Sequence, residues 1–175
     1  IVNCEGFDSK IEDGFGETLL ESLLYLSGSD EVCTSKEDNI LLKSMIKSIL
    51  SSKTFDFNAK DLNNDTAINV ACEYPNEVWV VEALVSKKNI DVNVVNDFDC
   101  SAVENCIRNK NMEALKLLGQ RPDLIIRKQA KDLAKECGIK LDEYIKPTES
   151  IFGKYVVESD VVKTEDALEY ELTRA

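Results

Sequence analysis

Apolar residues recur along the middle of the chain in short clusters, at the three- and four-residue spacing of amphipathic helices. The cluster at residues 45–50 lies 35 residues before a similar cluster at 80–85, and a third follows 34 residues later, at 114–118. Small or apolar residues also occupy positions 68, 71 and 72, and again positions 103, 106 and 107. The pattern predicts pairs of short helices that repeat with a period of about 35 residues.

The polar segments between these helices repeat with the same period. Residues 56–68 (DFNAKDLNNDTAI) align with residues 91–103 (DVNVVNDFDCSAV), and aspartate, asparagine and alanine coincide at three aligned positions. A self-match sustained over two periods indicates a repeat architecture, in which each unit packs on its neighbours.

Each copy carries a turn and the start of a helix. We expect Thr66 and Ser101 to cap the helices that follow them, because a side-chain oxygen there can accept from free backbone N–H groups. Asn64 and Asp99 stand at the tightest point of each turn, and these residue types tolerate positive φ without requiring glycine.

The segment DFNAKDLNNDTAINVA resembles the ankyrin-repeat consensus, Asp-Val-Asn-Ala-x-Asp-x-x-Gly-x-Thr-Pro-Leu-His-x-Ala. It departs from the consensus at Asn64 (for Gly), Ala67 (for Pro) and Asn69 (for His), which suggests divergent repeats of moderate stability. The resemblance implies an all-α solenoid of about four stacked helix-turn-helix units, with extended turns between the repeats.

The repeat register divides the chain into a repeat domain, residues 1–146, and an acidic tail, residues 147–175. In the first repeat we expect a helix after Thr18 and a partner helix at 39–52. In the last, residues 132–138 resemble an inner helix of terminal repeats, and 139–146 could form a final helix. We expect the tail to be partly disordered or to form one short helix at 164–174. The domain divides into a degenerate N-terminal repeat at about 8–52 with an inserted polar loop at 27–38, repeats at about 56–88 and 91–120, and a C-terminal capping repeat at about 121–146.

The net charge of −12 is confined to the two flanks. Residues 1–38 hold ten acidic and two basic residues, residues 39–146 hold sixteen of each, and residues 147–175 hold seven and three. The lack of a basic stripe argues against nucleic-acid binding. Because no apolar run approaches the ~18 residues needed to span a bilayer, we expect no membrane insertion. We see no positively charged start followed by an apolar stretch that would mark a signal peptide.

The residue types point away from catalysis. Without histidine there is no Ser-His or Cys-His pair and no mixed Cys/His zinc site. Phosphate-binding loops and calcium-loop spacing are also missing, so we expect a non-enzymatic protein without catalytic, cofactor or metal sites. The six cysteines form no C-x-x-C pair, which favours a reduced, intracellular protein, cytoplasmic or nuclear. We expect Cys72 and Cys106 to fill the core and Cys100 to be exposed.

The resemblance also implies where a partner would bind. In ankyrin-type proteins, the turn tips and the outward ends of the inner helices form a concave binding surface. Leu62 and Phe98 are apolar residues at tip positions where water favours polar ones, although Phe98 could instead pack on the preceding tip. Aromatic and arginine side chains are common interface anchors. The candidate partner-binding residues are Lys60, Leu62, Asp65, Tyr74, Asp97, Phe98 and Arg108.

Three functions fit the sequence. The first is a binding module, monomeric by itself, that docks another protein or a peptide on the concave face. The second is an IκB-like inhibitor or charge mimic, whose acidic flanks compete for a basic surface. The third is the targeting domain of a larger enzyme or of a secreted effector.

Overall fold

The computed structural model describes residues 16–28 and 35–145. All the helices in these residues are short, and the only β-structure there consists of isolated bridges. The predicted all-α class is therefore confirmed for the described residues. The elements are, in chain order, α1 (Leu19–Gly28), α2 (Lys36–Leu50), α3 (Ala67–Glu73), the 3-10 helix η1 (Pro75–Glu77), α4 (Val78–Val85), α5 (Ala102–Arg108), α6 (Met112–Leu118), α7 (Lys128–Glu136) and the 3-10 helix η2 (Leu141–Glu143).

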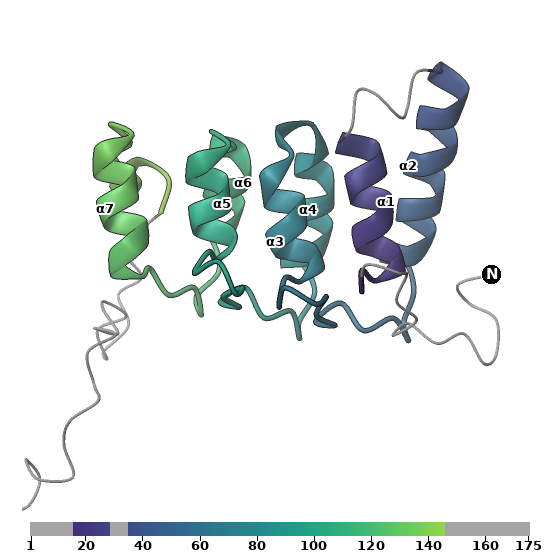
Figure 1. Cartoon of the computed structure of the whole chain (residues 1–175), viewed down its shortest axis with the longest axis horizontal. Coiled ribbons are helices and arrows are strands. Elements are labelled where there is room, and N and C mark those ends of the chain that lie inside the picture. Colours follow the sequence, from purple (N-terminus) through teal and green to yellow (C-terminus); the bar gives the residue numbers. More distant parts are fainter. Residues whose placement is uncertain (1–15, 29–34, 146–175) are drawn as a thin grey trace, which may run out of the picture.

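The helices stand side by side in two layers (Figure 1). In the first layer, α1, α3, α5 and α7 each contact the next. In the second layer, α2 contacts α4 and α4 contacts α6. Each second-layer helix also packs on the first-layer helix that precedes it in the chain. The pairs α1–α2, α3–α4 and α5–α6 therefore form a row of helical units, and α7 extends the first layer.

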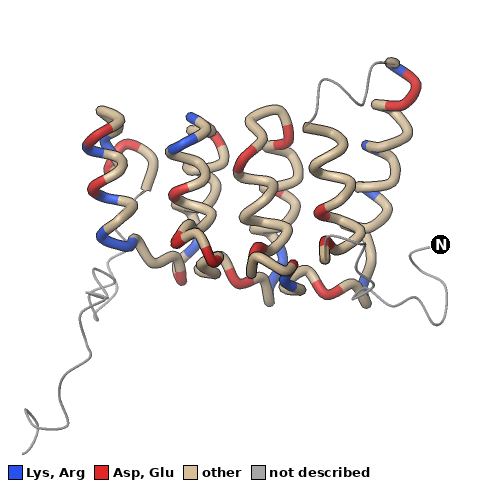
Figure 2. The backbone as a smooth tube through the Cα atoms, in the orientation of Figure 1, with Lys and Arg blue, Asp and Glu red and all other residues tan. Residues whose placement is uncertain are grey.

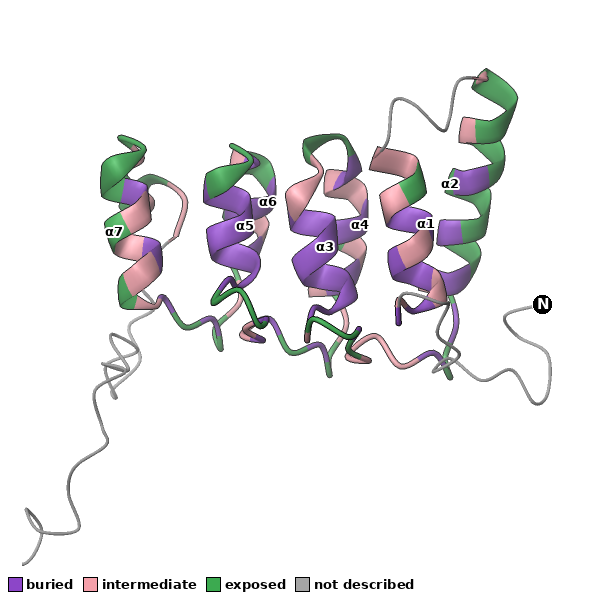
Figure 3. Cartoon of the chain, viewed as in Figure 1, coloured by how far each residue is buried: buried purple, intermediate pink, exposed green. Residues whose placement is uncertain are grey.

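A continuous apolar core runs along the row between the two layers (Figure 3). Every unit contributes large aliphatic side chains that are fully buried, and Cys72 and Cys106 are buried among them as predicted. Removing these side chains from water is the main favourable term in folding such short helices. The largest aliphatic members are Leu20, Leu24, Ile46, Ile49, Ile68, Leu84, Ile107, Leu115 and Leu118.

The loops that precede α3 and α5 each fold around one polar side chain. Asp61 Oδ1 accepts from the backbone N–H groups two and four residues ahead, at 2.9 and 2.8 Å. Asn96, 35 residues later, does the same at 3.0 and 2.9 Å. Both turns pass through positive φ, 61° at Asn64 and 58° at Asp99, as the sequence predicts.

The two predicted helix caps have different outcomes. Ser101 caps α5 as predicted, and its partner Glu104 completes a capping box by accepting from the Ser101 backbone N–H at 3.0 Å. The prediction for Thr66 is wrong, because its hydroxyl donates to Asn69 Oδ1 (3.0 Å) and accepts no backbone N–H group.

Asparagine side chains join each inter-unit loop to the next. Asn58 donates to the carbonyl of Asn89 (2.8 Å) and accepts from the backbone N–H two residues further on (2.9 Å). Asn93 forms the same two bonds with the loop that carries Asp123, both at 2.8 Å. An amide can donate and accept at once, so one side chain satisfies two backbone groups of the neighbouring loop.

Two further asparagines join the helices of neighbouring units. Asn105 on α5 donates to the Asn69 carbonyl of α3 at 3.1 Å. Asn111 donates to the carbonyl of Cys72 at 3.2 Å, and its Oδ1 caps α6 by accepting from the Ala114 N–H. Both side chains are buried, so each bond replaces water that the neighbouring carbonyl has lost.

Basic side chains satisfy carbonyl groups at the C-terminal ends of the second-layer helices. Lys87 Nζ donates to the Leu50 carbonyl at the end of α2 (2.7 Å). Arg121 donates to the carbonyls of Val85, at the end of α4 (3.1 Å), and Ile90 (3.2 Å). A cation is favourable there because the last carbonyls of a helix carry partial negative charge.

Two predicted boundaries need correction. The inserted loop predicted at 27–38 is shorter, because α1 continues to Gly28 and α2 begins at Lys36 rather than at 39. Ser35 explains the early start of α2, since its side chain caps the helix by accepting from the Asp38 N–H at 3.0 Å. At the other end of the row, α7 begins at Lys128 rather than at 132.

The segment predicted as a final helix is 139–146, and its described part, 139–145, contains only the three-residue η2. Gly138 has a φ of 69°, and the Ile139 N–H bonds back to the Ala134 carbonyl at 2.8 Å, which ends α7 and reverses the chain. The predicted start of the repeats at residue 8, most of the acidic flanks, and the tail with its helix at 164–174 lie outside the described residues.

We predict that Asn105→Ala lowers the free energy of unfolding by about 1–3 kcal/mol, because the Asn69 carbonyl and the Glu73 carboxylate would both lose the Asn105 amide donor. Urea denaturation monitored by circular dichroism measures this loss. Asn63→Ala is the matched control, since Asn63 is exposed at a turn tip and should change stability by less than about 0.5 kcal/mol. Equal losses in the two variants would contradict a special role for the inter-unit bond.

Candidate protein-binding face

Two neighbouring turn tips project from the same edge of the row. Leu62 on the first tip and Phe98 on the second are 70% and 69% exposed, and Lys60 and Asp97 are exposed beside them. The Asp97 N–H donates to the backbone carbonyl of Asn63 at 2.8 Å, so backbone hydrogen bonding holds the tips together. Four of the predicted residues therefore lie on one edge, and Phe98 is not packed away.

Two residues predicted at exposed turn positions are buried instead. Asp65 is 5% exposed, and both its carboxylate oxygens accept from Asn96 Nδ2 at 3.0 Å. Cys100 is also buried, and its thiol lies 3.6 Å from the Phe98 carbonyl oxygen. Asp65 is thus a joint between the two loops and not a free contact residue, which corrects its assignment to the partner-binding set.

Tyr74 lies between the first two units. Its ring meets that of Tyr25 edge-on, with 6.3 Å between centroids and an angle of 88°. It also covers Gly28 so closely that a Cβ there would lie 2.2 Å from the ring. Both tyrosines are half-buried, so they pack α3 on α1 and still present part of each ring to solvent.

Carboxyl groups gather around these tyrosines. We call Asp61, Asp65 and Glu73 the acidic junction. Burial, followed by the charges of Asp65 and Asp61, raises the pKa of Glu73 to about 7. Burial and then the same three carboxylates raise the pKa of Tyr25 above its ordinary value. Across residues 16–28 and 35–145 no lysine or arginine forms an ion pair with the junction.

Equivalent positions of the first-layer helices carry different chemistry. The compared position lies seven residues after the residue that precedes each helix. It holds Tyr25 in α1, Glu73 in α3 and Arg108 in α5. Arg108 is exposed at the end of α5, whereas Tyr25 and Glu73 are half-buried between α1 and α3. Among the described residues, acidic groups therefore dominate the face at α1 and α3, and basic groups are frequent at α7 (Figure 2).

The acidic junction did not emerge from the sequence. It brings together two carboxylates of one loop, Asp61 and Asp65, and Glu73 in the last turn of α3. The aligned positions Tyr25, Glu73 and Arg108 are the signal that could have revealed it. Away from this face, Trp79 on α4 lies beside Lys47 of α2, with 5.7 Å between the Lys47 ammonium group and the centre of the ring.

The described residues contain no group of three His, Cys, Asp or Glu side chains that could hold a metal ion. None of the described helices is long and apolar enough to cross a membrane. Comparisons with protein-family models, with curated proteins and with solved structures found no match.

Two buried glutamates, Glu21 and Glu77, each have one carboxyl oxygen without a hydrogen-bond partner among the described residues. Glu21 stands three residues after Thr18 and accepts from the Thr18 N–H at 2.8 Å through Oε2, while Oε1 has no hydrogen-bond partner among the described residues. Burial raises the pKa of Glu21 to about 7, and the Asp61 and Asp65 charges add to the rise. Glu104, at the equivalent position of α5, faces Arg127 at 3.5 Å.

We predict that Glu21→Gln stabilises the protein at pH 8, by about 1–3 kcal/mol, and has little effect at pH 4.5. The folded state holds the Glu21 proton up to about pH 7, so stability falls as pH rises from about 4.5 to about 7. The side-chain amide of the Glu21→Gln variant does not ionise, so this loss of stability with pH is removed. Its oxygen can still accept from the Thr18 N–H. Urea denaturation at both pH values measures the difference.

The matched control is Glu104→Gln, which removes the charge that faces Arg127 and should destabilise the protein at pH 8. If the two glutamine variants responded alike, the difference between an uncompensated and a paired carboxylate would not explain the behaviour of Glu21.

Proposed function

We propose that the chain is a divergent ankyrin-type repeat protein. Three features support this proposal. The repeat motif recurs at 35 residues, the turns use positive φ where the consensus has glycine, and the helical pairs stand in a row with their loops on one edge. The losses of consensus glycine and proline are offset by the side-chain bonds of Asp61 and Asn96, which fix the same turns.

We further propose that it is a non-enzymatic module that binds a protein or peptide on the face formed by α1, α3, α5 and the two tips. The observation that carries this proposal is the exposure of Leu62 and Phe98 on tips that are fixed by backbone and side-chain bonds. Rigid, exposed apolar side chains gain free energy when a partner covers them and lose little conformational freedom on binding.

The surroundings favour a partner with both apolar and basic side chains. An apolar side chain can pack against Phe98, and an ammonium or guanidinium group can reach Glu73 beside the Tyr25 and Tyr74 rings. Such a cation gains both an ion pair and an aromatic contact. It would also lower the pKa of Glu73, because a nearby positive charge favours the ionised form.

A second candidate is an inhibitor that competes for a basic surface, as the charge-mimic hypothesis states. Glu73 of the acidic junction favours it, since this half-exposed carboxylate has no basic partner among the described residues. The two candidates differ in salt dependence. A mimic that relies on the acidic segments loses most of its affinity between low and physiological salt, whereas an apolar anchor does not.

We predict that Phe98→Ala lowers the affinity for a partner, isolated by two-hybrid screening and confirmed with purified proteins, by at least tenfold. Glu73→Gln should lower it less and reduce its salt dependence. Isothermal titration calorimetry measures both effects, and thermal melting should change little for Phe98→Ala because that side chain is exposed.

Ile40→Ala and Glu82→Gln are the controls, because both residues are exposed on second-layer helices. They should change the affinity by less than twofold. Loss of binding in these variants with full binding by Phe98→Ala would place the partner on the second layer. If deletion of residues 147–175 lowered affinity most at low salt, the inhibitor hypothesis would be favoured instead.

A further inference from the structure

The last first-layer helix lacks the partner that the others have. α1, α3 and α5 pack against α2, α4 and α6, whereas within the described residues α7 is followed only by the short η2. The chain returns toward α6 after Gly138, and a Cβ on Gly119 would lie 2.6 Å from the Tyr144 carbonyl oxygen. The segment that follows α7 is thus packed at the end of α6, and it leaves one side of α7 uncovered.

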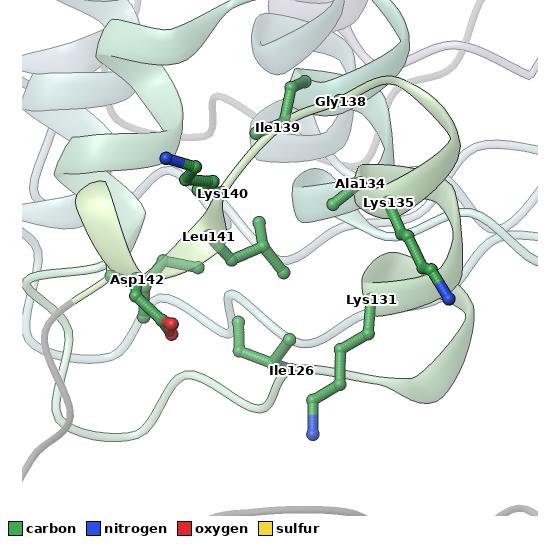
Figure 4. Close-up of a pocket in the computed structure, with 10 residues that line it drawn as sticks. Ile126, Lys131, Ala134, Lys135, Gly138, Ile139, Lys140, Leu141 and Asp142 are labelled. Carbon is green, nitrogen blue, oxygen red and sulfur yellow. The ribbon is translucent and has the colours of Figure 1, made fainter.

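An apolar cleft of about 590 Å³ lies at this end of the row, between α7 and the returning segment. Figure 4 shows aliphatic side chains from both walls around a common space, with lysine ammonium groups pointing away from it. The aliphatic lining includes Ile126, Ala134, Ile139, Leu141 and Ile145, and the basic residues are Lys131, Lys135 and Lys140. Solenoid ends need a cover, because the repeat that would bury their apolar surface is missing.

The chain itself supplies a segment that matches this cleft. Ile145 lines the cleft, and residues 146–175 continue directly from it. Residues 147–175 carry seven acidic and three basic residues. Their net charge is opposite in sign to that of the cleft, where three lysines outnumber Asp142, although Lys140 also pairs with Glu143 at 3.7 Å. Their apolar residues at 167, 168 and 172 have the spacing of one helix face. At about 3.3 Å per extended residue, a few residues suffice to reach across the cleft.

We propose that the C-terminal segment, residues 147–175, folds back and covers the apolar cleft beside α7. Its acidic side chains pair with Lys131, Lys135 and Lys140, and its apolar side chains take the place of the missing second-layer helix. This docking is independent of the partner-binding face, which lies along α1, α3 and α5.

Zero-length cross-linking of the full chain tests the proposal. A carbodiimide joins lysine amines to carboxylates that are in contact, and peptide mass spectrometry identifies the pairs. We expect links from Lys131, Lys135 or Lys140 to carboxylates between residues 149 and 171. A mixture of ¹⁵N-labelled and unlabelled chains distinguishes links within one chain, which carry a single isotope, from links between two copies.

Leu141→Asp should reduce these links at least fivefold, because it places a charge in the cleft. The control variant Ile40→Asp changes an exposed residue of α2 and should leave the links unchanged. Circular dichroism verifies folding. If Leu141→Asp unfolds the protein, the double variant Lys135→Glu/Lys140→Glu serves as the test, because both lysines are exposed. The links from Lys131 should fall in this variant.

Three outcomes would overturn the proposal. Mixed-isotope links would show that a second copy fills the cleft. Links from the segment distributed evenly over other lysines, such as Lys43 and Lys47, would show no preferred docking. The absence of any link between the segment and the three cleft lysines would assign the cleft to another occupant.

Discussion

The asparagine side chains between units are the constraint on which the row of helices depends. Helices of seven residues, such as α3, α5 and α6, are far too short to be stable alone, and each leaves several backbone groups unpaired at its ends. Asn105 and Asn111 supply donors to buried carbonyls of the preceding unit. The α5–α6 unit therefore adds to the hydrogen bonding of the α3–α4 unit, and the apolar core between them closes when the two are in register.

The same bonding decides which side chains remain available for contact. Because Asn96 holds Asp65 and Asp97 is tied to the preceding tip, the two turns have little freedom, and Leu62 and Phe98 project into solvent. Burial raises the pKa of Glu73, so ionising this carboxyl group costs stability as pH rises from about 4.5 to about 7. A half-exposed carboxylate without a basic partner among the described residues is suited to meet a positive charge.

The sequence predicted those features that each copy encodes within itself. The period, the positive φ at Asn64 and Asp99 and the cap at Ser101 all depend on residues close together in the chain. Features that depend on the next unit were missed. Asp65 occupies a position that the family consensus treats as variable, and it is buried because Asn96 lies opposite it. The short η2 likewise reflects the packing of Tyr144 beside Gly119, which no local pattern indicates.

The acidic C-terminal segment and the acidic junction are not equally available to a basic partner. If residues 147–175 occupy the cleft beside α7, their effective concentration there is that of a tethered ligand, on the order of millimolar for a short flexible connection. A basic partner would have to displace them from three lysines before it could use their charge. The acidic junction has no such competitor among the described residues. An electrostatic partner would therefore be recognised first at α1 and α3, and the C-terminal segment would act on it only after leaving the end of the row.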